Sequence, residues 1–258
     1  MKTPADIQEI LDALARQHPN ADTELHYSNP FELLVATILS AQTTDAGVNQ
    51  ATPALFATYP TASALATAPV EHVEALVQRT GFFRQKARAI VGMSAALVER
   101  HGGEVPRTMD ALVKLPGVGR KTANVVLGHA LGVPGFPVDR HVLRVSNRLG
   151  IADSDDPERV EQQLTGALPP GWWTRASDTL ILHGRRVCKP TPSCEQCAAN
   201  ALCGFRIAAG RPAIALSTPR KATAPVRRAV KAVKAVKATK PAAGRAATKR
   251  VKAAGKRR

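Results

Sequence analysis

The chain has 258 residues, 44% of them hydrophobic and only 4% aromatic, which is enough for one large domain or two modest ones with a substantial core. No stretch approaches the roughly 20 apolar residues that cross a bilayer, and Met1-Lys2-Thr3-Pro4 lacks the apolar segment of a signal peptide. These features argue against membrane association and predict a cytoplasmic protein.

The formal net charge of +16 is unevenly distributed. Sixteen of the 36 Lys and Arg residues lie in residues 211–258, which contain no Asp or Glu. Residues 1–210 hold the other 20 basic residues and all 20 acidic ones. Because that part is formally neutral, any nucleic-acid-binding face on it must come from the local placement of charge.

Residues 1–205 are rich in Ala, Leu and Val and show almost no strand-like alternation, which predicts an all-α fold. Asn29-Pro30-Phe31-Glu32 has the Asn cap, first-position Pro and third-position Glu of a helix start. The apolar run over residues 33–39 then predicts a helix that is buried on most sides. Further along, Pro and Gly residues divide the chain into pieces of helical length.

The most informative segment is Leu115-Pro116-Gly117-Val118-Gly119-Arg120-Lys121. It predicts a turn at 116–119 between helices at 108–115 and 120–131. Gly117 and Gly119 are expected to adopt backbone angles closed to other residues and to let a phosphate reach the amides at the start of the second helix. Lys121, in the first turn, is a candidate amine nucleophile. The alternatives are a plain helix connection and an exposed helix lysine.

Later helices are expected at three places. Asp139 precedes Arg140 as a helix cap would, and it is also a candidate carboxylate partner for Lys121. Asp156-Pro157-Glu158 opens another helix, and Trp172-Trp173 leads into one that ends near Gly184.

The chain has four cysteines, all within sixteen residues: Cys188, Cys194, Cys197 and Cys203. Such clustering in an intracellular protein indicates a metal site rather than disulfides. One Cys-x2-Cys pair flanked by two more distant cysteines fits a [4Fe–4S] loop better than the two separated pairs typical of zinc. Zinc stays open as the alternative.

Residues 206–258 are predicted to be a disordered polybasic tail. Ala-Val-Lys occurs three times in succession over 229–237, and a period of three does not hold a stripe on a helix. The tail is expected to act either as an arm that adds sequence-independent DNA affinity or as a solubilising extension.

Three segments resemble the endonuclease III family of DNA glycosylase/AP lyases. Residues 115–123 resemble its helix-hairpin-helix, and Val138-Asp139-Arg140-His141-Val142 resembles the segment with its catalytic aspartate. Leu39-Ser40-Ala41-Gln42-Thr43-Thr44-Asp45 resembles its DNA-facing loop. Together with the cysteines, the resemblance covers residues 5–205 and stops before the tail.

The resemblance implies a two-domain fold: a six-helix barrel at 23–133, and a [4Fe–4S] cluster domain made of 1–22 plus 134–205. It implies base excision repair in a bacterial cytoplasm, at the nucleoid, by a monomer acting on double-stranded DNA that contains oxidised pyrimidines or abasic sites. Cys188 and Cys194 are separated by five residues, where the family usually has six.

Roles for individual residues also follow from the resemblance. Lys121 would attack the sugar C1′ to give a Schiff base, and β-elimination would nick the strand 3′ to the abasic site, assisted by Asp139. The implied DNA-binding residues are a polar plug, an apolar wedge and the hairpin: Gln42, Phe82, Gly117, Val118, Gly119 and Arg120. Ordinary core packing of Phe82 and Phe83 is the alternative to the wedge.

Other functions on this scaffold stay open. An adenine glycosylase would lack the hairpin lysine and would have a glutamate on the helix before the plug loop, where Val35-Ala36-Thr37-Ile38 offers no acid. A mismatch or uracil glycosylase, or a non-catalytic DNA-binding protein, is also possible, although the presence of both Lys121 and Asp139 argues against the latter. His129, His141 and His183 are interpreted as structural or DNA-adjacent.

Overall fold

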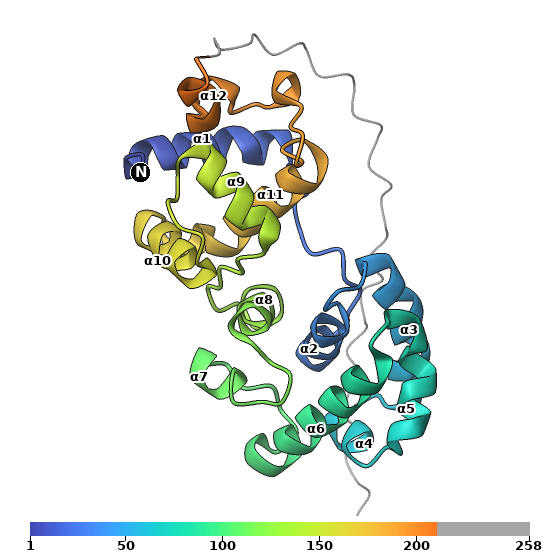
Figure 1. Ribbon diagram of the computed structural model, residues 1–258. Helices are drawn as coiled ribbons and strands as arrows, with labels where there is room; N and C mark the ends of the chain where they lie inside the picture. The colour runs from blue at the N-terminus through green and yellow to red at the C-terminus, as the bar shows by residue number, and fades with distance from the viewer. Residues whose placement is uncertain (211–258) are drawn as a thin grey trace, which may run out of the picture. The chain divides into compact units, whose positions relative to one another are not determined.

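The computed structural model describes residues 1–210, which form helices and connecting turns with no strand among them (Figure 1). The all-α prediction is therefore confirmed for this part of the chain. Residues 211–258 of the predicted polybasic tail lie outside the described residues. The predicted start of the tail at residue 206 is wrong, because residues 206–208 belong to the last helix, Gly204–Ala208. No helix in the described part is long and apolar enough to cross a membrane.

The α-helices are α1 (Pro4–Gln17), α2 (Pro30–Leu39), α3 (Asp45–Thr58), α4 (Ala62–Ala66), α5 (Val70–Val77), α6 (Phe83–His101), α7 (Met109–Leu112), α8 (Arg120–Ala130), α9 (Arg140–Leu149), α10 (Pro157–Ala167), α11 (Trp173–Arg186) and α12 (Gly204–Ala208). Short 3-10 turns are η1 (Gln78–Thr80), η2 (Pro170–Trp172), η3 (Cys194–Gln196) and η4 (Asn200–Leu202).

The predicted helix starts are confirmed by their caps. The Asn29 side chain accepts a hydrogen bond from the Glu32 amide, and every residue of α2 from Phe31 to Leu39 except Glu32 is buried. The Asp156 side chain caps α10 in the same way. The helix after Trp172 ends at Arg186, two residues beyond the expected glycine.

The helix predicted at 108–115 is shorter than expected. Thr108 is its N-cap, but α7 ends at Leu112. Leu115 precedes Pro116, whose ring disfavours the α conformation in the residue before it. The chain therefore leaves the helix before the turn. Isolated main-chain hydrogen bonds connect the two, among them the one from the Leu115 N–H to the Leu112 carbonyl.

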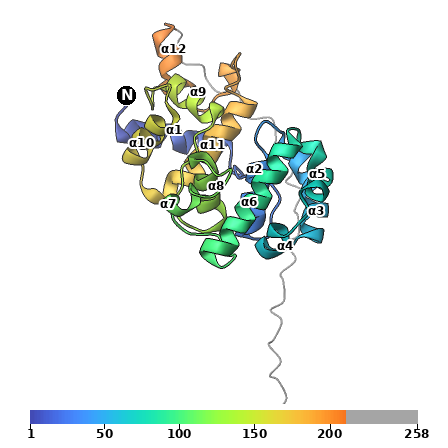
Figure 2. The same cartoon turned by 60° about the horizontal axis from the view of Figure 1, so that its bottom comes forward.

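Two hydrophobic cores organise these helices. One consists of buried side chains from residues 25–131, with α2 at its centre. The other joins the inner face of α1 to buried residues of α9, α10, α11 and the cysteine segment. Helix α8 packs on both α2 and α11, and Figures 1 and 2 show it between the two groups of helices. The start of α8 is therefore placed where the two cores meet.

Candidate active site

The turn before α8 owes its shape mainly to one of its two glycines. Gly117 has φ +74°, and a Cβ there would lie 3.1 Å from the Ala89 Cβ of α6. Gly119 has φ −92°, which any residue adopts, so the expectation that its backbone angles require glycine is wrong. A Cβ on Gly119 would meet only open space. The missing side chain of Gly119 instead leaves the main chain accessible.

The first amides of α8 are available to a ligand. No side chain caps this helix, in contrast to α2, α9 and α10. Uncapped amides at a helix N-terminus, together with the helix dipole, attract an anion. The turn thus offers main-chain donors at the position where the sequence predicts phosphate contact.

The side chains of Val118 and Arg120 are directed to the protein itself. Val118 is buried in the core, and its N–H donates to the Leu115 carbonyl. The Arg120 guanidinium forms two hydrogen bonds to the carboxylate of Glu161 on α10, at 2.9 and 2.8 Å. No local sequence pattern indicates this partner, which lies 41 residues away.

Lys121 and Asp139 line one cavity of about 80 Å³, whose walls also include residues of α2, α11 and the segment 22–25. Lys121 is the exposed second residue of α8. Asp139 is the N-cap of α9: its Oδ1 accepts from the His141 and Val142 amides at 2.7 and 2.9 Å. The capping interpretation of Asp139 is correct, and the carboxylate borders the same cavity as the lysine.

A second set of charged side chains also lines this cavity. Arg185 on α11 lies 2.7 Å from the Glu24 carboxylate and 2.9 Å from that of Asp45. All three residues line the cavity. The Arg185 guanidinium is therefore held by two carboxylates, and it links α11 to residues outside its own core.

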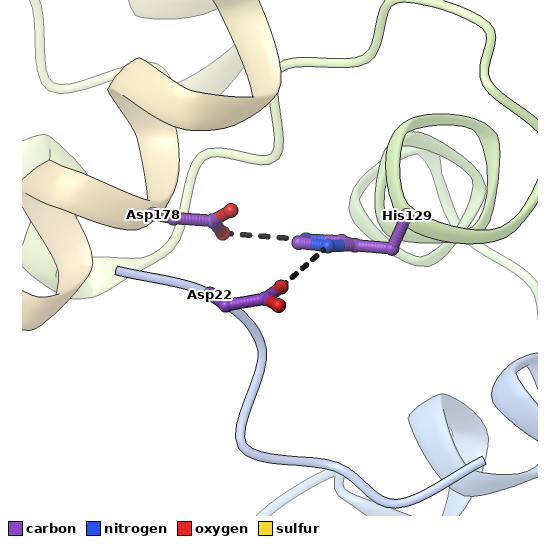
Figure 3. A group of neighbouring side chains, drawn as sticks. All are labelled: Asp22, His129 and Asp178. Atoms are coloured by element: carbon purple, nitrogen blue, oxygen red, sulfur yellow. Dashed lines mark ion pairs between the residues drawn. The ribbon is translucent and has the colours of Figure 1, made fainter. Parts of the chain in front are cut away.

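His129, in the last turn of α8, lies between two carboxylates (Figure 3). Its Nδ1 is 3.2 Å from Asp22 and its Nε2 is 3.3 Å from Asp178. Burial opposes a charge on His129, but the hydrogen bond and charge of Asp178, and then Asp22, outweigh burial and raise its pKa.

These three side chains also place their ligand atoms within 4.8 Å of one another. Because each ring nitrogen faces its own carboxylate, the arrangement matches a protonated imidazole with both N–H groups donating better than it matches a metal ligand, which needs a free ring nitrogen. The structural interpretation of His129 is supported, with partners that sequence reasoning missed.

Gln42 and Phe82 are exposed residues at the tips of two loops. Both have positive φ, 54° and 47°, and they are the two non-glycine residues with that conformation in residues 1–210. The Phe82 side chain is 66% exposed, whereas Phe83 packs against the first core. Core packing is therefore excluded for Phe82 and partly correct for Phe83.

The four cysteines line a single pocket, together with Arg148 and Arg206. All are free thiols; Cys197 and Cys203 are buried, and Cys188 and Cys194 are partly buried. Burial raises the pKa of Cys197 to about 12. Thiolates in such a place need a cation beside them, and Arg148 lies 3.6 Å from the Cys188 sulfur.

The chemistry of the donor set fits an iron–sulfur cluster. Four free thiols line one pocket, and thiolates are the ligands that hold [4Fe–4S] clusters.

His183 is fully buried behind this pocket. Its Nε2 lies 3.5 Å from the Cys197 sulfur and its Nδ1 lies 3.1 Å from the His18 Nε2. Burial lowers the pKa of His183 to about 3 and of His18 to about 4. Both rings are therefore neutral structural partners of the cysteine segment.

Comparison with known families gives one clear match. Residues 35–170 match the HhH-GPD superfamily of base excision DNA repair proteins. The chain is 49% identical to endonuclease III of Synechocystis over 197 residues, which are 76% of this chain and 90% of that protein. It is 43% identical to endonuclease III of Escherichia coli K12 over 199 residues, 77% of this chain and 94% of the relative.

Solved structures agree. A trapped covalent intermediate of endonuclease III with DNA, in an estranged-adenine complex, matches with a TM-score of 0.77 and 44% identity. The match covers 82% of this chain and all of that one. A thermostable thymine-DNA glycosylase matches with a TM-score of 0.71 at 22% identity, over 79% of this chain and 98% of that one, and shares the fold.

Proposed function

The chain belongs to the endonuclease III family, and we propose that Lys121 and Asp139 are the residues with which it acts on damaged DNA. The protein is a DNA glycosylase and AP lyase of base excision repair. The observation on which the assignment of residues rests is that Lys121 and Asp139 border one cavity at the starts of two helices, of which only α9 has a side-chain cap.

The chemistry follows from the two groups. The Lys121 nitrogen forms a bond to the sugar C1′ as the glycosidic bond breaks, and the base leaves with the bonding electrons and takes up a proton. Loss of a proton from the nitrogen and opening of the sugar ring give the Schiff base. Removal of a C2′ proton then expels the 3′ phosphate by β-elimination, and water releases the lysine.

Asp139 stabilises the positive charge that develops on the sugar and relays protons. Its Oδ1 is held by two main-chain amides, which fixes the carboxylate in position. Within residues 1–210, these two hydrogen bonds both engage Oδ1, and Oδ2 is proposed as the oxygen that acts on the substrate.

The substrate we propose is double-stranded DNA with an oxidised pyrimidine or an abasic site. A target base must leave the stack before C1′ can be attacked, and exposed side chains must fill the resulting gap. Gln42 and Phe82 are exposed, and Phe82 is the most exposed large apolar residue in the described chain. The start of α8, with Gly117, Gly119 and the amide of Arg120, would hold the strand by its phosphate.

The cofactor we propose is a [4Fe–4S] cluster held by Cys188, Cys194, Cys197 and Cys203. The four thiols that line one pocket and the positive charge of Arg148 support it. Bound there, the cluster would fix the segment 188–203 and would take no part in base excision, because these residues line a different pocket from Lys121.

Borohydride trapping tests the nucleophile. The wild-type chain should form a covalent adduct with an abasic duplex on reduction, and Lys121→Ala should form none. Lys114→Ala, which removes an exposed lysine just before the same turn, is the matched control and should trap normally. Trapping by Lys121→Ala at the wild-type level would remove Lys121 from this role.

The alternatives are not favoured. An adenine glycosylase would need an acid on α2, and Glu32, the only acidic residue there, accepts a hydrogen bond from the Ser28 amide at 2.7 Å in the first turn. A protein that only binds DNA would retard an abasic duplex in a gel without nicking it. One incubation with that duplex therefore distinguishes a lyase from a non-catalytic DNA-binding protein.

The basic residues after 210 lie outside the described residues, and their proposed role rests on charge alone. They would add sequence-independent affinity by releasing counterions from DNA. Deleting residues 217–258 should then reduce the slope of log affinity against log salt. An unchanged slope would contradict this role and leave the solubilising one.

A further inference from the structure

Two loops with strained tips lie side by side at one end of the first core. Gln42 lies between α2 and α3, and Phe82 lies between η1 and α6. Positive φ is uncommon for bulky non-glycine residues and persists only where the surroundings enforce it. Something in the fold must therefore hold both tips in place.

The contacts of Lys86 identify what holds them. Lys86, on the first turns of α6, is only 5% exposed. Its Nζ donates to the Thr43 Oγ1 at 2.7 Å and to the Thr80 carbonyl at 2.6 Å. Thr43 follows Gln42 directly, and Thr80 precedes Phe82 by two residues. The Thr43 hydroxyl also donates to the Thr80 carbonyl, so the three groups form a closed set.

The charge of Lys86 has no acidic partner. Within residues 1–210, no carboxylate forms an ion pair with it, and burial lowers its pKa. A buried ammonium without a counterion does not improve stability over an apolar side chain of similar length. We therefore assign the Lys86 ammonium group a geometric role: it holds the Thr43 hydroxyl and the Thr80 carbonyl in fixed positions.

We propose that Lys86 is a positioning residue that fastens the Gln42 loop to the Phe82 loop, so that both side chains enter damaged DNA as one rigid unit and together set the preference for lesion-containing over intact duplex. The proposal rests on the proposed function, in which Gln42 and Phe82 fill the gap left by an extruded nucleotide. Lys86 itself does not touch DNA, because it is covered by the loops that it joins.

The test measures the dissociation constants of the full-length protein for a duplex with a stable abasic analogue and for the same duplex without it. The ratio of the two constants is the lesion preference. Lys86→Met, which removes the charge and keeps the length, should lower this preference about tenfold or more while the melting temperature stays level or rises. Arg100→Met, which removes a charge at the far end of α6, should change neither quantity.

A spectroscopic readout separates positioning from folding. A 2-aminopurine placed opposite the abasic analogue should become brighter when the wild-type protein unstacks it, and Lys86→Met should reduce this increase at saturating protein. Lys86→Arg, whose guanidinium offers donors to both acceptors, should restore part of it. Thr43→Val removes the hydroxyl but keeps the shape of the side chain. It should also reduce the increase in fluorescence, and it replaces Lys86→Met as the test if Lys86→Met fails to fold.

The outcomes distinguish the two levels of the proposal. If Gln42→Ala and Phe82→Ala leave the lesion preference unchanged, the proposed role of the two tips is wrong. If these variants lower it but Lys86→Met and Thr43→Val do not, the tips act without the fastening, and the proposal for Lys86 is overturned. If Lys86→Met combined with Phe82→Ala loses no more preference than Phe82→Ala alone, the two residues act as a unit, as expected.

Discussion

The Nε2 of His129 on α8 lies 3.3 Å from the Asp178 carboxylate on α11, and both side chains are more than nine-tenths buried. The two helices belong to different cores, so this contact is an electrostatic connection between them. Asp22, on the other side of the ring, is 74% exposed and contributes less, because solvent screens its charge.

The His129 contact predicts a stability that depends on pH. Its pKa is raised above 6.5 in the folded chain, so its stabilising contribution is fully present below pH 6.5 and is lost as the pH rises through the folded value. The difference in melting temperature between the wild type and His129→Gln should therefore shrink from pH 6.5 upward. Asp178→Asn should remove most of this pH dependence and Asp22→Asn little of it. A difference that grows with pH would contradict the assignment.

Asp139 can be separated into its two roles by the choice of substitution. Asn caps helices about as well as Asp, so Asp139→Asn should keep α9 intact, whereas Asp139→Ala should cost about 1 kcal/mol of unfolding free energy. Both should slow strand cleavage by a factor on the order of 10²–10⁴, as expected for loss of a proton-transferring group. Single-turnover cleavage of an abasic duplex, measured alongside thermal melting, checks both effects. Wild-type cleavage by Asp139→Asn would show that the residue is only a cap.

The two glycines of the turn before α8 should respond differently to alanine. Gly117→Ala places a Cβ 3.1 Å from Ala89 in a left-handed conformation, at a cost of roughly 1–2 kcal/mol for the backbone alone. Gly119→Ala has an ordinary φ and open space, so its melting temperature should stay unchanged. Its affinity for abasic-analogue DNA should nevertheless fall, because the new methyl group covers the main chain. Equal affinity for Gly119→Ala and wild type would argue against phosphate contact there.

The cysteine pocket predicts a coloured protein. The chain purified without added metal should absorb in the visible range through charge transfer from thiolate to iron, and Cys197→Ala should lose this band. Ser193→Ala, a change in the same pocket, should retain the band. A colourless wild-type chain with one zinc would contradict the proposed cluster.

Many of the helix starts can be predicted from short stretches of sequence. The cap at Asn29, the proline after it and the buried run that follows define α2 without reference to any other segment, and Asp156 does the same for α10. These signals succeed because a helix start is decided within four residues. The error at α7 has a local cause too, since Pro116 disfavours the α conformation in the residue before it.

The contacts that the sequence did not reveal join segments far apart in the chain. His129 contacts Asp22 and Asp178, which are 107 and 49 residues away in the sequence, and no local pattern predicts such contacts. No local pattern distinguishes Lys86 from an exposed helical lysine, and only the packing of two loops over it shows that it is buried. Candidate residues could be named from motifs, but their partners required the fold.

The turn before α8 exposes main-chain groups, because no side chain covers them. Gly119 has no side chain, and the side chain of Arg120 is held by Glu161. Main-chain amides that donate to phosphate oxygens carry no information about the base sequence. A protein that meets a duplex through such a surface treats all sequences alike, so it can sample undamaged DNA without being retained by favoured sites. With the proposed phosphate contact, the recognition of damage depends instead on the extrusion of the target nucleotide.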